Sequence, residues 1–312
     1  MRKTKDYILL YLKGIGMGGA DVIPGVSGGT IAFISGIYDE LIDSLKSIDV
    51  QALQLLGKFR LADFWKKING SFLLTVLAGV LTSLLSLAKL MTYLLAHYPI
   101  QIWSFFFGLI LVSAPLILRD VKHWNFATVL AGLLGVAIAY AITVLTPAET
   151  PTNLPFIFFC GALAICAMIL PGISGAFILL LIGKYEYMIT ALTSFNLPVI
   201  IVFALGCAGG LISFSHLLSW LLHRYRYPAL ALLAGFMIGS LNKVWPWKEV
   251  LSYRLNSEGE QVPAFDKSVL PGAFMDKTGA DPQVFHAILF AALGIFLIVA
   301  IEKTAAYLKS KH

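Results

Sequence analysis

The chain contains the segment Asp21-Val-Ile-Pro-Gly-Val-Ser-Gly-Gly-Thr30, and the core of this segment occurs again as Leu170-Pro-Gly-Ile-Ser-Gly175. A shift of 147 residues superimposes the two copies, and the match continues without a gap until Gly36-Ile-Tyr38 meets Gly183-Lys-Tyr185. Each copy lies inside an apolar run, where a Pro-Gly-x-Ser-Gly cluster interrupts a helix. Broken helices at corresponding positions of two halves of a membrane protein are typical of a binding site in a transporter.

The composition is that of a polytopic membrane protein. Of the 312 residues, 58% are hydrophobic and only 13% are charged, and the mean hydropathy is +0.83. Soluble domains contain about 25% charged residues. The net charge of +6 therefore reflects how basic residues are distributed between loops, and it does not indicate a nucleic-acid partner. The three cysteines lie in apolar stretches without disulfide or metal-binding spacing, and no cofactor is expected.

Six apolar runs, most of them close to 20 residues long, are predicted to span the membrane. Two further stretches, Gly14–Ile37 and Leu154–Ile182, are divided by Pro24-Gly25 and Pro171-Gly172. We interpret them as re-entrant hairpins that enter and leave the membrane on one face. The expected fold class is therefore all-α. The six predicted spans are Phe72–Ala96, Ile102–Leu118, Phe126–Thr146, Leu197–Leu222, Ala229–Leu241 and Val284–Leu308.

The internal repeat extends beyond the two hairpins. A shift of 127 residues places Gly79 on Gly206 and Tyr98 on Tyr225. The chain therefore divides into a first repeat at 1–150 and a second repeat at 151–312. Each is expected to hold a re-entrant hairpin followed by three transmembrane helices. The hairpins are expected at about 14–42 and about 154–189, and an outer loop at 245–282.

Three crossings per repeat require the two repeats to be inverted relative to each other. With both termini in the cytoplasm, 16 of the 23 Lys and Arg residues fall in cytoplasmic segments and six in outer segments, with Lys89 inside a span. This distribution satisfies the positive-inside rule. The long polar stretch Trp245–Asp281 is then on the outer face, where we expect a solvated loop or a small lid.

The residues that follow each Pro-Gly pair are suited to bind an anion. The start of a helix offers unpaired N–H groups and a positive dipole end, which attract a phosphate or a carboxylate. Two such helix starts meeting within the membrane would form one site reachable from either side. The alternative is that small residues here only permit close helix packing, but the presence of two related copies favours the site. The candidate binding residues are Ser27, Gly28, Gly29, Thr30, Ser174 and Gly175.

Ionisable residues at membrane depth are costly, so each is a candidate for function. Asp21 lies beside the first break and aligns with Met168, which suggests a coupling role in one half only; alternatively it caps a backbone amide. Lys89 lies in mid-span and aligns with His216. Both are candidate contacts for an anionic group, although Lys89 could instead snorkel to the interface or pair with Asp21, and His216 could be a packing residue.

Three further charged residues lie near the predicted interfaces. Asp39 and Glu186 follow the matched Gly-x-Tyr turns and are candidate gating or coupling acids, although solvated helix ends are the simpler and favoured explanation of both. Arg119 ends a predicted span on the cytoplasmic side and is a candidate headgroup contact, although topology alone also accounts for it.

Several of these motifs resemble the bacterial and archaeal polyprenyl-phosphate transporters, a family long described as a domain of unknown function. The resemblance covers nearly the whole chain. Ala176 departs from the expected pattern, where a second small hydroxyl residue would stand, and so does Asn242, where a basic residue is common. The matching segments are Gly18–Phe33, Gly36–Tyr38, Phe106–Ile110, Met168–Gly175 and Gly239–Trp247.

The resemblance implies that the chain is a flippase of the plasma membrane. Its cargo would be undecaprenyl phosphate, the lipid carrier of cell-wall precursors, returned from the outer to the inner leaflet by alternating access. A coupling ion, H⁺ or Na⁺, is expected because no nucleotide-binding P-loop is present. Two alternatives remain: a transporter or channel for a small soluble anion, and a membrane-embedded polyprenyl-diphosphate phosphatase. The phosphatase lacks support because no clustered Arg, His and Ser set can be assembled, so we expect the chain not to be an enzyme.

Overall fold

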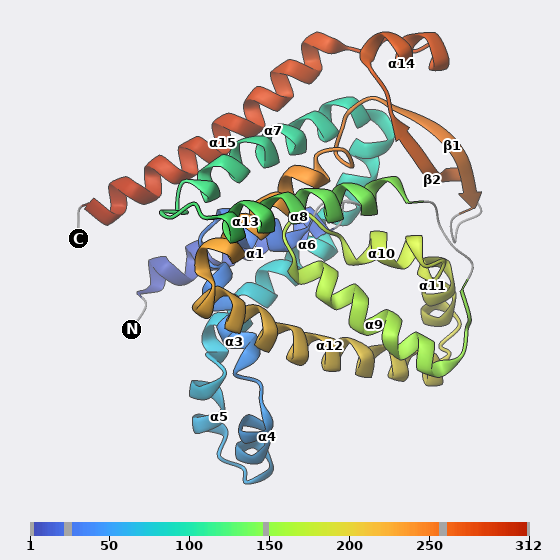
Figure 1. Cartoon of the computed structure of the whole chain (residues 1–312). Coiled ribbons are helices and arrows are strands. Elements are labelled where there is room, and N and C mark those ends of the chain that lie inside the picture. Colours follow the sequence, from blue (N-terminus) through green and yellow to red (C-terminus); the bar gives the residue numbers. More distant parts are fainter. Residues whose placement is uncertain (1–2, 22–26, 146–149, 256–260, 311–312) are drawn as a thin grey trace.

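The computed structural model describes residues 3–21, 27–145, 150–255 and 261–310, and most of these residues are helical (Figure 1). The break Pro24-Gly25 lies outside the described residues. The first half contains α1 (Thr4–Asp21), α2 (Gly28–Ile34), α3 (Tyr38–Lys46), α4 (Val50–Gly57), α5 (Leu61–Lys67), α6 (Gly70–His97), α7 (Pro99–Leu118) and α8 (Phe126–Val144). The second half contains α9 (Leu154–Ile169), α10 (Gly175–Leu181), α11 (Tyr185–Thr193), α12 (Leu197–Arg224), α13 (Arg226–Ser240), β1 (Lys248–Leu255), β2 (Gln261–Ser268), α14 (Pro271–Thr278) and α15 (Val284–Ser310).

The two halves repeat the same order of elements. The shift of 147 residues carries the bounds of α2 and α3 onto those of α10 and α11, and the shift of 127 carries α6 onto α12. The turns match as well, because Gly36 and Gly183 both have a positive φ, 72° and 64°. Residues other than glycine rarely adopt this conformation. The repeat seen in the sequence is thus a repeat of helices and of the turns between them.

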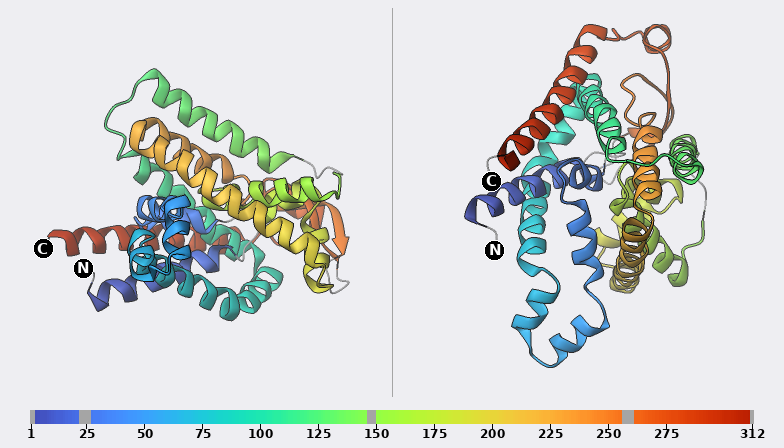
Figure 2. Two further views of the ribbon diagram at one scale, coloured as in Figure 1. Left: turned by 90° about the horizontal axis from the view of Figure 1, so that it is seen from below. Right: turned by 60° about the vertical axis from the view of Figure 1, so that its left-hand side comes forward.

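The helices pack in pairs, first within each half and then between the two halves. Within each half the first helix packs on the first long helix, α1 on α6 and α9 on α12. The later helices pack across the halves, because α8 lies against α13 and α15 lies against α7 (Figures 1 and 2). The largest buried cluster joins both hairpins to α7 and α13, and it includes Ala32, Ile110, Ile169 and Met237. The two hairpins therefore end in a common core.

The length and composition of the helices agree with a polytopic membrane protein. Within the described ranges, three helices are long and apolar enough to cross a membrane: α7, α8 and α12. The helix α5 and the start of α6 form a further pair, bent by 72°, that qualifies as one unit. The helix α13, predicted as a span, has 15 residues, and α15 is apolar over Val284–Ala300. The first hairpin also begins earlier than expected, since α1 starts at Thr4.

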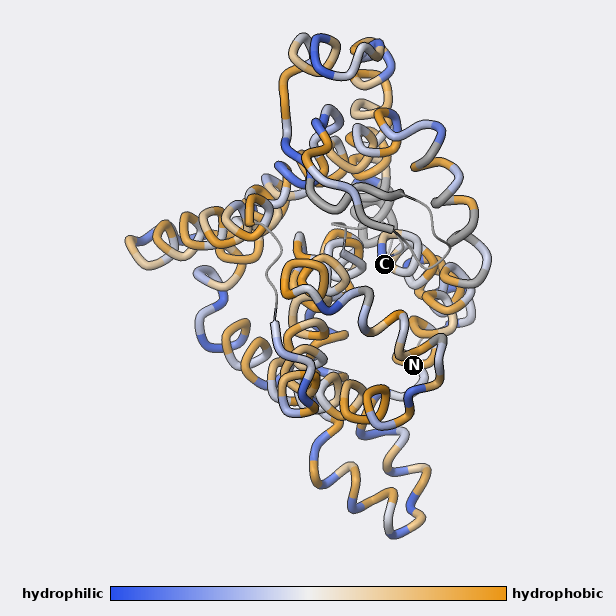
Figure 3. Tube along the Cα trace, turned by 90° about the vertical axis from the view of Figure 1, so that its right-hand side faces the viewer, coloured by the Kyte–Doolittle hydropathy of each residue, from blue (hydrophilic) through white to orange (hydrophobic). Residues whose placement is uncertain are grey.

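Large apolar side chains cover much of the outside of these helices. Phe126 is 83% exposed, Phe296 is 70% exposed and Leu133 is 62% exposed. Exposed apolar surface of this extent marks an interaction with another apolar phase, such as a membrane. The hydrophobic colouring along the long helices illustrates the pattern (Figure 3).

The stretch Trp245–Asp281 is not simply a loop or lid, as the sequence suggested. It forms an antiparallel pair of strands, β1 and β2, followed by the short helix α14 (Figure 1). Two indoles anchor the unit, because Trp245 Nε1 donates to Val269 O at 2.8 Å and Trp247 Nε1 donates to Pro282 O at 2.7 Å. The all-α prediction is therefore wrong for this segment.

Candidate functional site

The start of α2 lies directly against the break in the second hairpin. Ser27 is the N-terminal cap of α2, and its hydroxyl accepts a hydrogen bond from Gly29 N at 3.1 Å. The same hydroxyl lies 3.0 Å from Met168 O and 3.1 Å from Leu170 O, to which it donates. Ser27 is fully buried. One side chain thus caps its own helix and satisfies carbonyls of the other half.

Two more side chains of the first half complete this contact. Thr30 Oγ1 accepts from Gly172 N at 2.8 Å, and the buried Tyr38 hydroxyl donates to Ile169 O at 3.1 Å. A broken helix leaves backbone groups without partners, and these must be satisfied when buried. The first hairpin therefore supplies hydrogen-bonding partners for the break at Pro171.

Gly29 makes this approach possible. A Cβ at this position would lie 2.5 Å from Ile169 O and 3.1 Å from Met168 O. Both are backbone atoms, which cannot move aside as a flexible side chain can. At Gly29 the structure therefore shows the close packing through a small residue that was considered above as the alternative to a binding role.

Asp21 provides a negative charge at the start of α2. Its Oδ1 accepts from Gly28 N at 2.7 Å. The equivalent residue of the second half, Met168, has no charge and is 38% exposed. The capping role considered for Asp21 is therefore present in the structure, and the N–H group of Gly28 already has an anionic partner.

The second hairpin has a different environment. Ser174 is the N-terminal cap of α10, and its hydroxyl accepts from Phe177 N at 3.5 Å. Ser174 lines a small cavity together with Gly172, Thr143 and Lys243. The Lys243 ammonium lies 4.5 Å from the centre of the Phe177 ring and 3.2 Å from Asp266 Oδ1. Gly175 follows Ser174 and is buried.

Sequence reasoning did not select Lys243. The residue lies in the Gly239–Trp247 segment that carried part of the family resemblance, directly after Asn242. Asn242 itself donates from Nδ2 to Thr143 Oγ1 at 2.8 Å. The available signal was a lysine directly after a predicted span on the outer face, where the positive-inside rule does not account for it.

The other predicted residues do not gather at the hairpins in the same way. His216 Nδ1 lies 2.8 Å from Ile212 O on its own helix, in agreement with a packing role. Arg119 is exposed at the C-terminal end of α7. Lys89 lies in α6 and Glu186 in α11, but their side chains lie outside the part of the chain that can be described.

Asp39 belongs to a charged contact between the halves. Arg226 Nη1 lies 3.2 Å from Asp39 Oδ2. One turn further along α3, Ser219 Oγ donates to Asp43 Oδ1 at 2.7 Å, and Lys46 Nζ donates to Ser219 Oγ at 3.2 Å. These contacts join α3 to α12 and to the start of α13. Among the described elements, α6 and α11, the equivalents of α12 and α3, do not share a comparable interface.

Within the described ranges, no group of three or more His, Cys, Asp or Glu side chains is arranged to hold a metal ion. The site thus consists of hydroxyl groups, backbone amides, one carboxylate and a lysine.

A family model described as undecaprenyl phosphate translocase-like matches residues 17–262. The chain belongs to this family. A protein of Vibrio cholerae named polyprenyl-phosphate transporter is 48% identical over 303 residues, which cover 97% of this chain and 98% of the relative. A protein of Staphylococcus aureus with the same name is 32% identical over 258 residues, which cover 75% of this chain and 85% of the relative. No solved structure matches the chain.

These findings confirm the family resemblance inferred from the hairpin motifs. Family members are named as transporters, which confirms that the chain is a transporter and not an enzyme. The phosphatase alternative is therefore discarded. The residues of the site, the inversion of the two halves and the domain boundaries stay predictions.

Proposed function

We propose that this protein transports undecaprenyl phosphate, or a closely related polyprenyl phosphate, from the outer to the inner leaflet of the plasma membrane. Membership of the family and the names of both relatives support the cargo. The polar headgroup crosses between the two halves, while the polyprenyl tail stays in the lipid. The direction follows from the expected role of the lipid as a carrier that must be reused.

The observation that carries this proposal is the meeting of two broken helices in one core. A phosphate monoester has about −1.5 to −2 charges at neutral pH, and moving it unassisted into hydrocarbon is prohibitive. Hydroxyl groups, amide groups and nearby cations can replace its water. The Ser27–Leu170 and Thr30–Gly172 hydrogen bonds bring both hairpins to one place in the molecule.

In this proposal the first hairpin supports the site and the second hairpin binds the headgroup. Ser27, Gly28, Gly29 and Thr30 hold the hairpins together, and the headgroup binds from the side of Ser174 and Gly175, where Lys243 lines a cavity of about 10 Å³ that has to widen to admit a phosphate. Lys89, His216 and Arg119 are retained as contacts along the path of the headgroup. In the inverted arrangement the two halves alternate between states that open to opposite faces.

The interface between α3 and α12 serves as the closure on the cytoplasmic face. The neighbouring ion pair Asp39–Arg226, which joins α3 to the start of α13, has no equivalent at the shifted positions, because these are Glu186 and Pro99. Opening this side requires the ion pair and the Asp43–Ser219 hydrogen bond to break. Uptake of H⁺ or Na⁺ near Asp21 is the proposed coupling step, and Asp39 and Glu186 contribute to gating.

The test is movement of undecaprenyl phosphate between leaflets of proteoliposomes. We expect the native protein to move the lipid and the pair Ser27→Ala and Ser174→Ala to abolish movement. Ser213→Ala is the matched control, because Ser213 is exposed on α12 and donates only to Gly209 O of its own helix in the contacts described. Thermal unfolding in detergent shows whether each variant is folded.

Two outcomes would contradict the proposal. If the native protein moves no polyprenyl phosphate under any H⁺ or Na⁺ gradient but moves inorganic phosphate, the alternative of a small-anion transporter is correct. If the folded double serine variant transports like the native chain, the hairpins are not the headgroup path.

A further inference from the structure

Two lysines share a single carboxylate beside the second hairpin. Lys243 Nζ lies 3.2 Å from Asp266 Oδ1, and Lys248 Nζ lies 3.6 Å from Asp266 Oδ2. All three side chains are largely buried, with 14%, 10% and 22% of the side-chain surface of Lys243, Lys248 and Asp266 exposed. Buried charges are normally paired, and here the cluster has one positive charge more than its carboxylate can balance.

Aromatic rings and a backbone carbonyl hold the two ammonium groups in place. Lys243 stands over the ring of Phe177, and Lys248 stands 4.0 Å from the centre of the Trp103 ring. Lys248 also donates to Lys243 O at 2.6 Å. The two cations are thus fixed close together, and Lys243 faces the cavity that contains Ser174.

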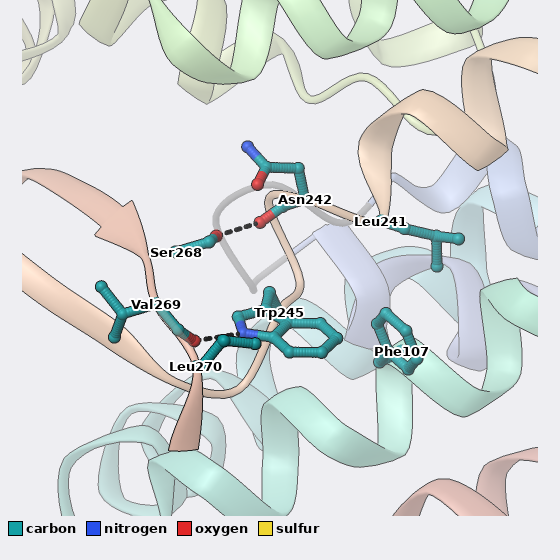
Figure 4. Close-up of a pocket in the computed structure, with 7 residues that line it drawn as sticks. All are labelled: Phe107, Leu241, Asn242, Trp245, Ser268, Val269 and Leu270. Atoms are coloured by element: carbon teal, nitrogen blue, oxygen red, sulfur yellow. Dashed lines mark hydrogen bonds between the residues drawn. The ribbon is translucent and has the colours of Figure 1, made fainter. Parts of the chain in front are cut away.

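An apolar cavity of about 390 Å³ lies next to this cluster (Figure 4). Phe107, Leu241, Trp245 and Leu270 form much of its wall. The charged side chains do not line this cavity, but two of their neighbours do, because Asn242 precedes Lys243 in the chain and Ser268 pairs with Lys248 across the two strands. Ser268, two residues after Asp266, also lines the cavity, and its hydroxyl donates to Asn242 O at 2.9 Å.

We propose that Lys243 and Lys248 bind the phosphate monoester of the lipid substrate, while the apolar cavity takes the first isoprene units of its chain. This inference rests on the proposed function and adds to it the place where the headgroup is received. A pair of cations beside an apolar cavity fits a ligand that is both anionic and hydrophobic. Lysine is a common ligand for phosphate because it provides a compact charge.

Asp266 has a defined role in this site. In the absence of the lipid its carboxylate keeps both ammonium groups in position, so that little ordering is needed on binding. The phosphate then takes over the contact with Lys243 and Lys248. Asp266 therefore competes with the ligand, and its negative charge also offsets the repulsion between the two ammonium groups.

The test measures binding and transport with the full-length protein in lipid vesicles. We expect Lys243→Gln and Lys248→Gln each to raise the concentration of undecaprenyl phosphate at half-saturation about tenfold, as expected for the loss of a charge-assisted hydrogen bond. Lys277→Gln is the matched control, because Lys277 is also paired with a carboxylate, Glu249, in the same unit but is 46% exposed. It should leave half-saturation unchanged.

The variant Asp266→Asn distinguishes a phosphate-binding role of the lysine cluster from a purely structural role. If the cluster binds phosphate, this variant is less stable to heat but binds undecaprenyl phosphate more tightly, because the competing carboxylate is gone. If the cluster only holds the β-hairpin in place, Asp266→Asn weakens binding as Lys243→Gln does, and the inference is wrong. Lys243→Arg keeps the charge and should retain most of the binding.

Separate ligands distinguish a failure of this inference from a failure of the proposed function. If Lys243→Gln and Lys248→Gln reach half-saturation at the same concentration of undecaprenyl phosphate as the native protein and still transport the lipid, only the inference is overturned. Lysine-dependent binding of inorganic phosphate without any movement of the lipid would overturn the function, and it would also remove the role proposed for the apolar cavity.

Discussion

The first hairpin carries a carboxylate at its break, whereas the second carries an uncharged methionine and receives a lysine from the end of α13. In the first hairpin, Gly28 N is bound to Asp21 and the Ser27 hydroxyl is bound to carbonyls of the other half. In the second, among the described residues, the Ser174 hydroxyl makes one long contact, 3.5 Å to Phe177 N of its own helix, and lines a small cavity with Lys243. Two copies of one motif have therefore acquired different surroundings.

This difference supports the proposed division, in which the first hairpin is a support and the second hairpin receives the headgroup. The first hairpin satisfies the orphan backbone groups of the second, which leaves the second free to present its polar groups to a cavity. A perfectly symmetric pair would have to satisfy both breaks in the same way. The following predictions address this division, beginning with the one expected to have the largest effect.

Gly29→Ala is expected to have the largest effect of a single substitution at the hairpins. Its Cβ would lie 2.5 Å from Ile169 O, so the two hairpins must separate. Overpacking typically costs about 1–3 kcal/mol and occasionally more; because the atom approached here belongs to the backbone, we expect a loss above the upper end of this range and no transport of polyprenyl phosphate. Thermal unfolding and the vesicle assay measure both effects.

The second half provides the control for this prediction, because the position equivalent to Gly29 is Ala176. Ala176→Gly should fold and transport nearly as the native chain does. If Gly29→Ala and Ala176→Gly behaved alike, the two hairpins would not differ in the way the contacts suggest.

Ser27→Ala should destabilise the protein more than Ser174→Ala. The first substitution removes a helix cap and leaves the carbonyls of Met168 and Leu170 without their partner, at about 2–3 kcal/mol in total. The second removes a cap alone, at about 1 kcal/mol. Denaturation of each single variant measures the difference, and equal losses would show that the contact between the hairpins contributes little.

Much of the helical framework could be predicted from the sequence because its signals are local. The glycine turns at Gly36 and Gly183, the two serine caps and the apolar runs each act within a few residues, and the shift of 147 residues located them in both halves. Family membership followed from the same motifs. The contact of Asp39 with Arg226 could not be predicted, because it joins segments far apart in the chain.

The β-hairpin was missed for a related reason. Its strands carry alternating charges and a proline, Pro263, which usually argue against a strand. In a sheet of only two strands each strand has an unpaired edge, so a proline is tolerated there. The Lys243–Asp266 ion pair then depends on this sheet and could not be foreseen without it.

Asp21→Asn should have a smaller effect on stability than Ser27→Ala, the serine substitution at the first hairpin. Asparagine still offers an oxygen to Gly28 N, so only the favourable charge at the start of α2 is lost, at about 0.5–1 kcal/mol. If Asp21 couples transport to an ion, the variant should move polyprenyl phosphate at a rate that no longer depends on H⁺ or Na⁺ gradients. A gradient dependence like that of the native chain would restrict Asp21 to capping.

The smallest expected effect is a dependence of lipid binding on pH through Lys248. Burial lowers the pKa of Lys248 to about 7 from its ordinary 10.5, against the opposing charge of Asp266 and together with the repulsion of Lys243. Burial would raise the pKa of Asp266, but the charges and hydrogen bonds of Lys248 and Lys243 outweigh it and lower that pKa. Asp266 therefore stays ionised while Lys248 loses its proton as the pH rises through 7.

Binding and stability should consequently change in opposite directions above pH 7. The phosphate monoester has its second pKa near 6, so the ligand is already a dianion and weaker binding between pH 7 and 8.5 reports on Lys248. Over the same range the unfolded chain binds more protons at this lysine than the folded chain, so the free energy of unfolding rises with pH. Titrating both quantities in the native protein and in Lys248→Gln tests this: the substitution should remove both slopes, and a native binding slope that survives it would assign the pH dependence to another group.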